Sequence, residues 1–189
     1  MTGPQVYAML ENETLWEAAL HCHAVLKQAE VAHAVCGGVA VCLHGYQRNT
    51  VDVDVLIRKE SSETVRRVFE DEGLEWIPER HEFVTPSKIP IPFLLAGDRA
   101  GSGSVLTLPD PAETTTTETI DGLPVLRLSR LFETKIACGE GNPRRTHKDF
   151  ADVVELIAIN HLDGSFARFL HRTVRKTYRQ LARNARGAD

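Results

Sequence analysis

Two adjacent glycines followed, thirteen residues later, by an Asp-x-Asp pair are the feature that most constrains how this chain of 189 residues can fold. Gly37 and Gly38 predict a tight turn, and Asp52 and Asp54 lie within the apolar run 51–57. Side chains two residues apart on a strand point to the same face. Two carboxylates on one face repel each other unless a hard cation such as Mg²⁺ lies between them. The pattern therefore predicts a metal site made by Asp52 and Asp54.

Periodicity and capping signals predict the elements around this pattern. We expect helices from Thr14 to Leu26, over 39–44, from Ser61 or Ser62 to Gly73, over 129–139, from about 146 onwards and over 164–184. We expect strands at 34–36, 51–57, 82–85, 91–96, 105–108 and 123–126, and an exposed strand or loop at 113–119. This order predicts an α/β (α+β) fold with a mixed sheet flanked by helices and a helical C-terminal part.

The run from Gly37 to Asp54 resembles the signature of the nucleotidyltransferase-fold superfamily (polymerase beta-like). It is also similar to a narrower group of small bacterial nucleotidyltransferase-like proteins, which includes the abortive-infection toxin type. The resemblance continues through Lys135 and the stretch Lys148-Asp149-Phe150-Ala151-Asp152. It implies a nucleotidyltransferase-like domain over residues 1–128 and a helical part over 129–189, packed on that domain.

The resemblance also implies an activity, the transfer of a nucleotide from an NTP such as ATP to an acceptor hydroxyl. Asp52 and Asp54 would bind Mg²⁺ or Mn²⁺ and be the catalytic residues. The expected substrate-binding residues are Gly37, Gly38, Arg48, Thr50, His44, Lys135 and Asp149.

Several of these residues have a structural alternative. Gly37 and Gly38 can approach phosphates or serve close packing, and Arg48 can meet a phosphate or pair with an acid. His44 can touch substrate or make a structural hydrogen bond. Asp149 and Asp152 share a helix face in a first turn, where acids are favourable in any case.

One departure from the superfamily pattern concerns a third carboxylate, which the resemblance places on a neighbouring strand. Pro92 stands at that position, and proline can neither bind metal nor act as a base. Glu82 and Asp98 are the nearest acids, but neither has the right offset along the sequence. The alternative function is therefore a degenerate protein that binds a nucleotide or a partner without turnover.

The C-terminal segment differs in charge from the rest of the chain. Residues 164–189 hold seven Lys and Arg against one Asp, whereas residues 1–163 hold 15 against 25 acids. Six arginines recur at helical spacing, which predicts a one-sided basic stripe on the last helix: Arg168, Arg172, Arg175, Arg179, Arg183 and Arg186. Such a stripe suits an RNA backbone, for example tRNA. A solvated helix face or a homodimer contact are the alternatives.

The group resemblance adds a role as a toxin that modifies tRNA and is neutralised by an antitoxin. No apolar run approaches the ~20 residues that span a membrane, and the N-terminus has no signal-peptide pattern. We therefore expect a cytoplasmic protein without membrane contact.

Overall fold

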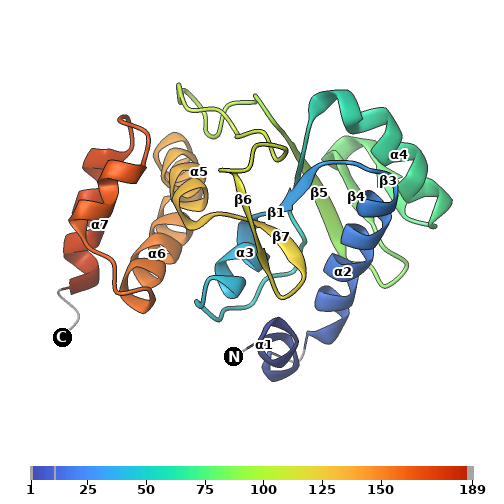
Figure 1. Cartoon of the computed structure of the whole chain (residues 1–189), viewed down its shortest axis with the longest axis horizontal. Coiled ribbons are helices and arrows are strands. Elements are labelled where there is room, and N and C mark those ends of the chain that lie inside the picture. The colour runs from blue at the N-terminus through green and yellow to red at the C-terminus, as the bar shows by residue number, and fades with distance from the viewer. Residues whose placement is uncertain (1, 11, 187–189) are drawn as a thin grey trace.

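The computed structural model describes residues 2–10 and 12–186, and its centre is a seven-stranded mixed sheet with the strand order β3-β4-β5-β2-β1-β7-β6. Figure 1 shows this sheet between α4 at one end of the molecule and α7 at the other. The strands are β1 (His33–Val35), β2 (Val55–Ile57), β3 (Glu75–Ile77), β4 (Glu82–Val84), β5 (Pro90–Leu95), β6 (Thr117–Ile120) and β7 (Leu123–Leu126). β2 pairs in parallel with β5, β1 pairs in parallel with β7, and the remaining pairs are antiparallel.

The helices lie around this sheet and form the C-terminal part. They are α1 (Gly3–Met9), α2 (Glu13–Gln28), α3 (Gly37–Leu43), α4 (Ser62–Asp71), α5 (Leu128–Gly141), α6 (Pro143–Ile159) and α7 (Arg175–Arg186). Short 3₁₀ turns occupy Lys59–Ser61, Pro78–Arg80 and Gly164–Phe169. None of the helices in the described part of the chain is long and apolar enough to cross a membrane.

Apolar periodicity explains the helices that cover the sheet. In α2, Leu15, Ala19, Cys22 and Leu26 are buried at helical spacing. In α4, Phe69 is fully buried and its ring contacts Phe83 and Phe93 on two neighbouring strands. This contact assigns α4 to the sheet face that carries Phe83 and Phe93.

The predicted fold class is confirmed, and several element predictions are wrong. Residues 105–108 form a loop rather than a strand. Thr107 makes only one isolated bridge, with Arg99, and the alternating apolar residues Leu106 and Leu108 are buried within this loop. The helix α1 and the three-residue strand β3 were not predicted. Strand β2 begins at Val55 rather than at residue 51, although the segment before it remains hydrogen-bonded through Val53 to Pro90.

The C-terminal part differs from its prediction at two points. Helices α5 and α6 follow each other directly at Asn142, whose side chain accepts from the amide of Arg144, so the expected loop 139–146 is absent. The last helix begins at Arg175 rather than at residue 164, because the chain turns from the extended Leu170 onwards. The basic stripe is therefore divided between a 3₁₀ turn, a loop and α7.

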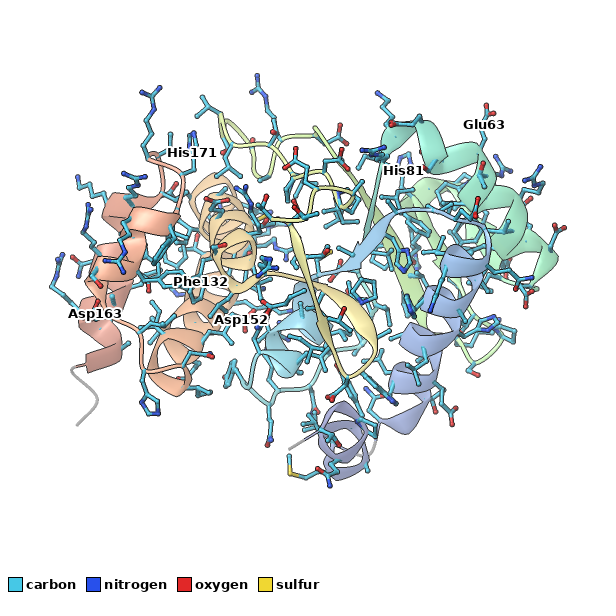
Figure 2. All side chains as sticks on the ribbon, in the orientation of Figure 1. Glu63, His81, Phe132, Asp152, Asp163 and His171 are labelled. Carbon is cyan, nitrogen blue, oxygen red and sulfur yellow. The ribbon has the colours of Figure 1, made fainter. Side chains whose placement is uncertain are left out.

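An aromatic group joins α7 to the other C-terminal helices. Figure 2 labels Phe132 of α5, whose ring centroid lies 5.7 Å from that of Phe166 and 5.4 Å from that of Tyr178. Phe132 and Tyr178 are fully buried and belong to one apolar core that continues beneath the sheet. The proposed division at residue 128 stays a prediction, since the core runs through both parts.

Candidate active site

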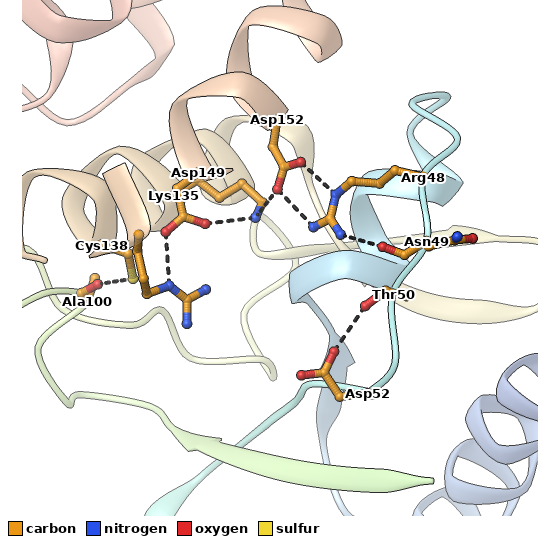
Figure 3. A network of polar contacts seen from close by, with 10 residues as sticks. Arg48, Asn49, Thr50, Asp52, Ala100, Lys135, Cys138, Asp149 and Asp152 are labelled. Carbon is orange, nitrogen blue, oxygen red and sulfur yellow. Dashed lines mark hydrogen bonds and ion pairs between the residues drawn. The ribbon is translucent and has the colours of Figure 1, made fainter. Parts of the chain in front are cut away.

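The two aspartates of the Asp-x-Asp pair lie in the extended segment that enters β2, beside the start of α3. Asp52 accepts a hydrogen bond from Thr50 Oγ1 at 3.0 Å, as Figure 3 shows. The backbone of Asp54 is fixed by β1, because its carbonyl accepts from the amide of Cys36 at 2.9 Å. Both aspartates are partly exposed, whereas Val53 between them is buried. The two carboxylates are therefore carried by ordered backbone and remain partly accessible to solvent.

The two glycines pack directly against the residues of this pair. Gly37 has a φ of +58°, and a Cβ there would lie 1.7 Å from Asp54 Oδ2. A Cβ on Gly38 would lie 2.3 Å from Thr50 Oγ1. The amide of Gly38 also donates to the Asp54 carboxylate. Close packing, the alternative that the sequence left open, is thus what both glycines show, and a phosphate contact stays a prediction.

The electrostatics of Asp54 suit a divalent cation. Removal of water from its carboxylate, followed by the negative charge of Asp52, raises the pKa of Asp54 to about 6. Oxygen ligands and two adjacent negative charges are what Mg²⁺ and Mn²⁺ prefer. In the described part of the chain no group of three His, Cys, Asp or Glu residues could hold a metal. Asp52 and Asp54 by themselves offer carboxylate oxygens from two residues, so a cation held there would need further ligands from outside the described residues.

A buried network of charged side chains lies next to the aspartates (Figure 3). Lys135 Nζ contacts Asp152 Oδ2 at 2.6 Å and Asp149 Oδ1 at 3.2 Å. Arg48 donates to both oxygens of Asp152, at 2.6 and 2.9 Å, and Arg145 donates to Asp149 Oδ2 at 3.1 Å. Asp149 and Asp152 are fully buried and Lys135 is nearly so. Three cations against two carboxylates leave one positive charge in this network.

That positive charge acts on the aspartates. Lys135 and Arg145 both oppose the rise in the pKa of Asp54, so their charges lie close to its carboxylate. The spacing of the two acids in α6 turns both towards Lys135 of α5, because residues three apart share a helix face. Lys135 of α5 and Arg145 of α6 are thus brought near Asp54, which directly precedes β2.

The remaining predicted site residues have the following partners. Arg48 is engaged by Asp152, and its Nη1 donates to the carbonyl of Asn49 at 3.0 Å. His44 Nε2 lies 2.8 Å from the carbonyl oxygen of Leu126, and burial lowers the pKa of His44. Thr50 is buried beside Asp52. The structure brings Gly37, Gly38, Thr50, Asp52 and Asp54 together, with Lys135 adjacent, while roles in substrate binding stay predictions.

Sequence reasoning gave no role to Arg145, and it weighed Asp152 together with Asp149 without including Asp152 among the site residues. Two signals were present: Arg145 lies four residues before Asp149, and Asp152 lies three residues after it. Both spacings place side chains together on a helix. The pairing with Lys135 and Arg48 required the docking of α6 on α5 and on the loop that follows α3.

Pro92, expected where the superfamily carries a further acid, lies on β5 next to the aspartates. Val55 of β2 pairs with Phe93, and the amide of Val53 donates to the carbonyl of Pro90 at 3.0 Å. This register places Pro92 beside Asp54. The neighbour of Asp54 on the adjacent strand is therefore a residue without a carboxylate.

Comparisons with known proteins identify the fold and the family of the chain. A family model described as aminoglycoside-2''-adenylyltransferase matches residues 19–153. No curated protein matches the chain. A structure from Thermotoga maritima, described as a candidate nucleotidyltransferase, is similar with a TM-score of 0.50 and 16% identity, covering 80% of this chain and 96% of the other.

Two structures of the antibiotic-resistance factor ANT(2'')-Ia are similar as well, each with a TM-score of 0.52 and 14% identity. The solution structure covers all of this chain and 96% of the other, and the complex with adenylyl-2''-tobramycin covers 88% and 95%. These likenesses show the nucleotidyltransferase fold. Because the family model spans well over half of its length, the chain belongs to the aminoglycoside-2''-adenylyltransferase family of nucleotidyltransferases.

Proposed function

We propose that this protein transfers a nucleotide from an NTP, in the presence of Mg²⁺ or Mn²⁺, to a hydroxyl of an acceptor. The observation that carries the proposal is the Asp52–Asp54 pair beside the surplus positive charge of the Lys135 network. In this reaction the acceptor oxygen forms a bond to the α-phosphorus, the bond to the β-phosphate breaks, and pyrophosphate leaves.

The residues divide the work as follows. Asp52 and Asp54 would hold the cation, which neutralises phosphate charge when bound. Thr50 fixes the orientation of the Asp52 carboxylate through its hydroxyl. Lys135 and Arg145 present positive charge towards the place where pyrophosphate gains negative charge. Asp149 and Asp152 hold the side chains of Lys135 and Arg145 in place through ion pairs. They have no direct role in binding the metal ion in this proposal.

ATP is the donor to test first, and an aminoglycoside is the acceptor to test first. The support is the family description, an adenylyltransferase, and the structural neighbour solved with adenylyl-2''-tobramycin. Purified protein would be incubated with labelled ATP, GTP, CTP or UTP, with Mg²⁺ or Mn²⁺, and with tobramycin or total tRNA. Asp52→Asn should lose transfer and keep its melting temperature, whereas the exposed control Asp98→Asn should retain transfer. Equal transfer by wild type and Asp52→Asn would refute the assignment.

A second candidate function rests on Pro92. A chain without an acid beside Asp54 would bind nucleotide and cation without turnover. Binding of Mn²⁺–ATP by wild type, lost in Asp52→Asn, combined with no transfer to any of these acceptors, would support this alternative.

RNA is a second candidate partner, because the basic C-terminal surface is exposed. Arg168, Arg172, Arg179 and Arg183 are exposed. The Arg168 guanidinium lies 4.7 Å from the ring centroid of Phe169, whose exposure is 58%. Such a pair offers both a phosphate contact and a stacking face. Arg175 contributes less to this surface, because it donates to the carbonyl of Leu170. The side chain of Arg186, another member of the predicted stripe, lies outside the described side chains.

The RNA proposal predicts salt-dependent tRNA binding, measured by fluorescence anisotropy. Replacing Arg172 and Arg179 together by alanine should weaken binding about tenfold and reduce its salt dependence. The matched control replaces Arg66 and Arg67 of α4, at the opposite end of the molecule. Equal effects of both double substitutions would refute a dedicated surface. A homodimer contact at this surface is the alternative to RNA binding. A toxin role with an antitoxin partner is a further proposal, which RNA binding would support.

A further inference from the structure

The sheet face that carries Asp54 also carries Glu82, the acid that its offset along the sequence had set aside. β4 and β5 pair antiparallel with Glu82 directly opposite Pro92. Continuing the β2–β5 register by one residue from the Val55–Phe93 pair places Pro92 beside Asp54. The three positions therefore form one row across neighbouring strands, in the order Asp54, Pro92 and Glu82.

All three side chains belong to the same face of the sheet. Directly paired residues point to the same face, and neighbours along a strand point to opposite faces. Phe83 and Phe93 point towards α4, because both rings contact Phe69 of that helix. Glu82 and Pro92 consequently lie on the other face.

The spacing suits an indirect contact between the two carboxylates. Adjacent strands are about 4.8 Å apart, so the backbones of Asp54 and Glu82 are about 10 Å apart. A glutamate is one methylene longer than an aspartate, and the compact Pro92 ring lies between the two. An acceptor oxygen bound between Asp54 and Glu82 would have to lie within about 3 Å of the Glu82 carboxylate, the hydrogen-bond range that a general base requires.

The Glu82 carboxylate is available for this role. Its side chain is 14% exposed and is therefore shielded but reachable. Arg80 contacts one carboxylate oxygen at 3.4 Å, and the Arg80 side chain is 71% exposed. A pair of this kind is weak and easily exchanged. Asp98, the other acid considered, follows the end of β5 at Leu95 and so lies well beyond the row.

We propose that Glu82 is the general base of the transfer reaction, an inference that rests on the proposed function. As the acceptor oxygen attacks the α-phosphorus, its proton moves to the Glu82 carboxylate, and the electron pair of the breaking bond leaves with pyrophosphate. The acid expected beside Asp54 is thus supplied from one strand further out.

The test compares four variants with wild type in two measurements. The variants are Glu82→Gln, the control Glu75→Gln on β3, Pro92→Asp, and Pro92→Asp combined with Glu82→Gln. Glu75 pairs with Val84 and so lies on the same face, one strand further from Asp54. The first measurement is release of AMP or adenylylated product from ATP with Mg²⁺, using water and tobramycin as acceptors. The second is Mn²⁺ affinity in the absence of turnover, with Asp52→Asn as the negative control.

Glu82→Gln should lower kcat at least 100-fold, with Mn²⁺ affinity and melting temperature unchanged, and Glu75→Gln should have no effect on either measurement. Pro92→Asp should tighten Mn²⁺ binding, and in the double variant it should restore most of the lost turnover. Activity of Glu82→Gln within threefold of wild type would overturn the proposal. So would a loss of Mn²⁺ affinity in Glu82→Gln, because Glu82 would then be a ligand.

The outcome for wild type separates the two proposals. Binding of Mn²⁺–ATP without product from wild type, but with product from Pro92→Asp, would refute Glu82 as the base and leave the cation–nucleotide site standing. Wild type that binds no Mn²⁺–ATP and releases no product would refute the proposed function, and Glu82 with it.

Discussion

Replacing Asp152 by asparagine is the perturbation that tests the buried charge network most directly. The side chain of Asp152 is 2% exposed and accepts from Arg48 through both oxygens and from Lys135 through one. Arg48 and Lys135 are 15% and 5% exposed at the side chain, so water replaces little of the lost interaction. Removing one partner of a buried ion pair costs about 3–5 kcal/mol. For a chain of this length that corresponds to a fall in melting temperature of roughly 10 °C.

The assay is urea unfolding followed by circular dichroism, with Glu155→Gln as the control. Glu155 is an exposed acid on the same helix, so its loss should change the free energy of unfolding by less than about 0.5 kcal/mol. A loss of under about 1 kcal/mol in Asp152→Asn would contradict the reasoning, since it would mean that water or a neighbour satisfies Arg48 and Lys135. Combining Asp152→Leu with Arg48→Met should recover part of the stability, because both charges are then removed together.

Three further predictions concern single residues of the site. Asp54→Asn should raise the free energy of unfolding at pH 8 without divalent cations by up to roughly 2–3 kcal/mol and have little effect at pH 4, measured in urea. The pKa of Asp54 in the folded state is raised to about 6, so the fold binds an extra proton near pH 5 and loses stability as the pH rises through 6. Gly37→Ala should weaken Mn²⁺ affinity at least tenfold, because its methyl group would overlap the Asp54 carboxylate; unchanged affinity would show that Asp54 can move freely. His44→Ala should lower the melting temperature while leaving the KM for ATP unchanged, because His44 contacts the carbonyl of Leu126.

The sequence alone predicted the elements whose signals are local. The short helix and the extended segment with Asp52 and Asp54 follow from residues within twenty positions of each other, although Gly37 and Gly38 begin α3 rather than form a turn before it. The boundaries were less predictable. The arginine spacing indicated one continuous helix, yet the chain turns between Leu170 and Arg175, where a buried apolar residue at Val174 fits either conformation. The periodicity of apolar residues indicates which side chains are buried. It does not distinguish a helix from a loop here, because loops also bury side chains.

The relations between distant elements required the fold itself. Nothing in the spacing of Arg48 and Asp152, 104 residues apart, indicates their bidentate contact. The pairing of Glu82 with Pro92 depends on the register of the β4–β5 hairpin, where the left-handed Lys88 helps to form the turn. The offset of Glu82 along the sequence did not match the position expected for the third acid. The register of the paired strands nevertheless places Glu82 in the same row as Asp54.

The distribution of charge implies that the site forms only when the C-terminal helices dock. The β2 segment contributes the acids, and α5 and α6 contribute Lys135 and Arg145, which lower the cost of holding Asp54 ionised. Asp149 and Asp152 neutralise part of that positive charge and hold it in place without contacting Asp52 or Asp54. Loosening α6 should therefore weaken cation binding even though no ligand is removed. Asp152→Asn should lower Mn²⁺ affinity as well as stability, whereas Glu155→Gln should change neither, and a variant that loses stability with unchanged Mn²⁺ affinity would show that the two halves of the site act independently.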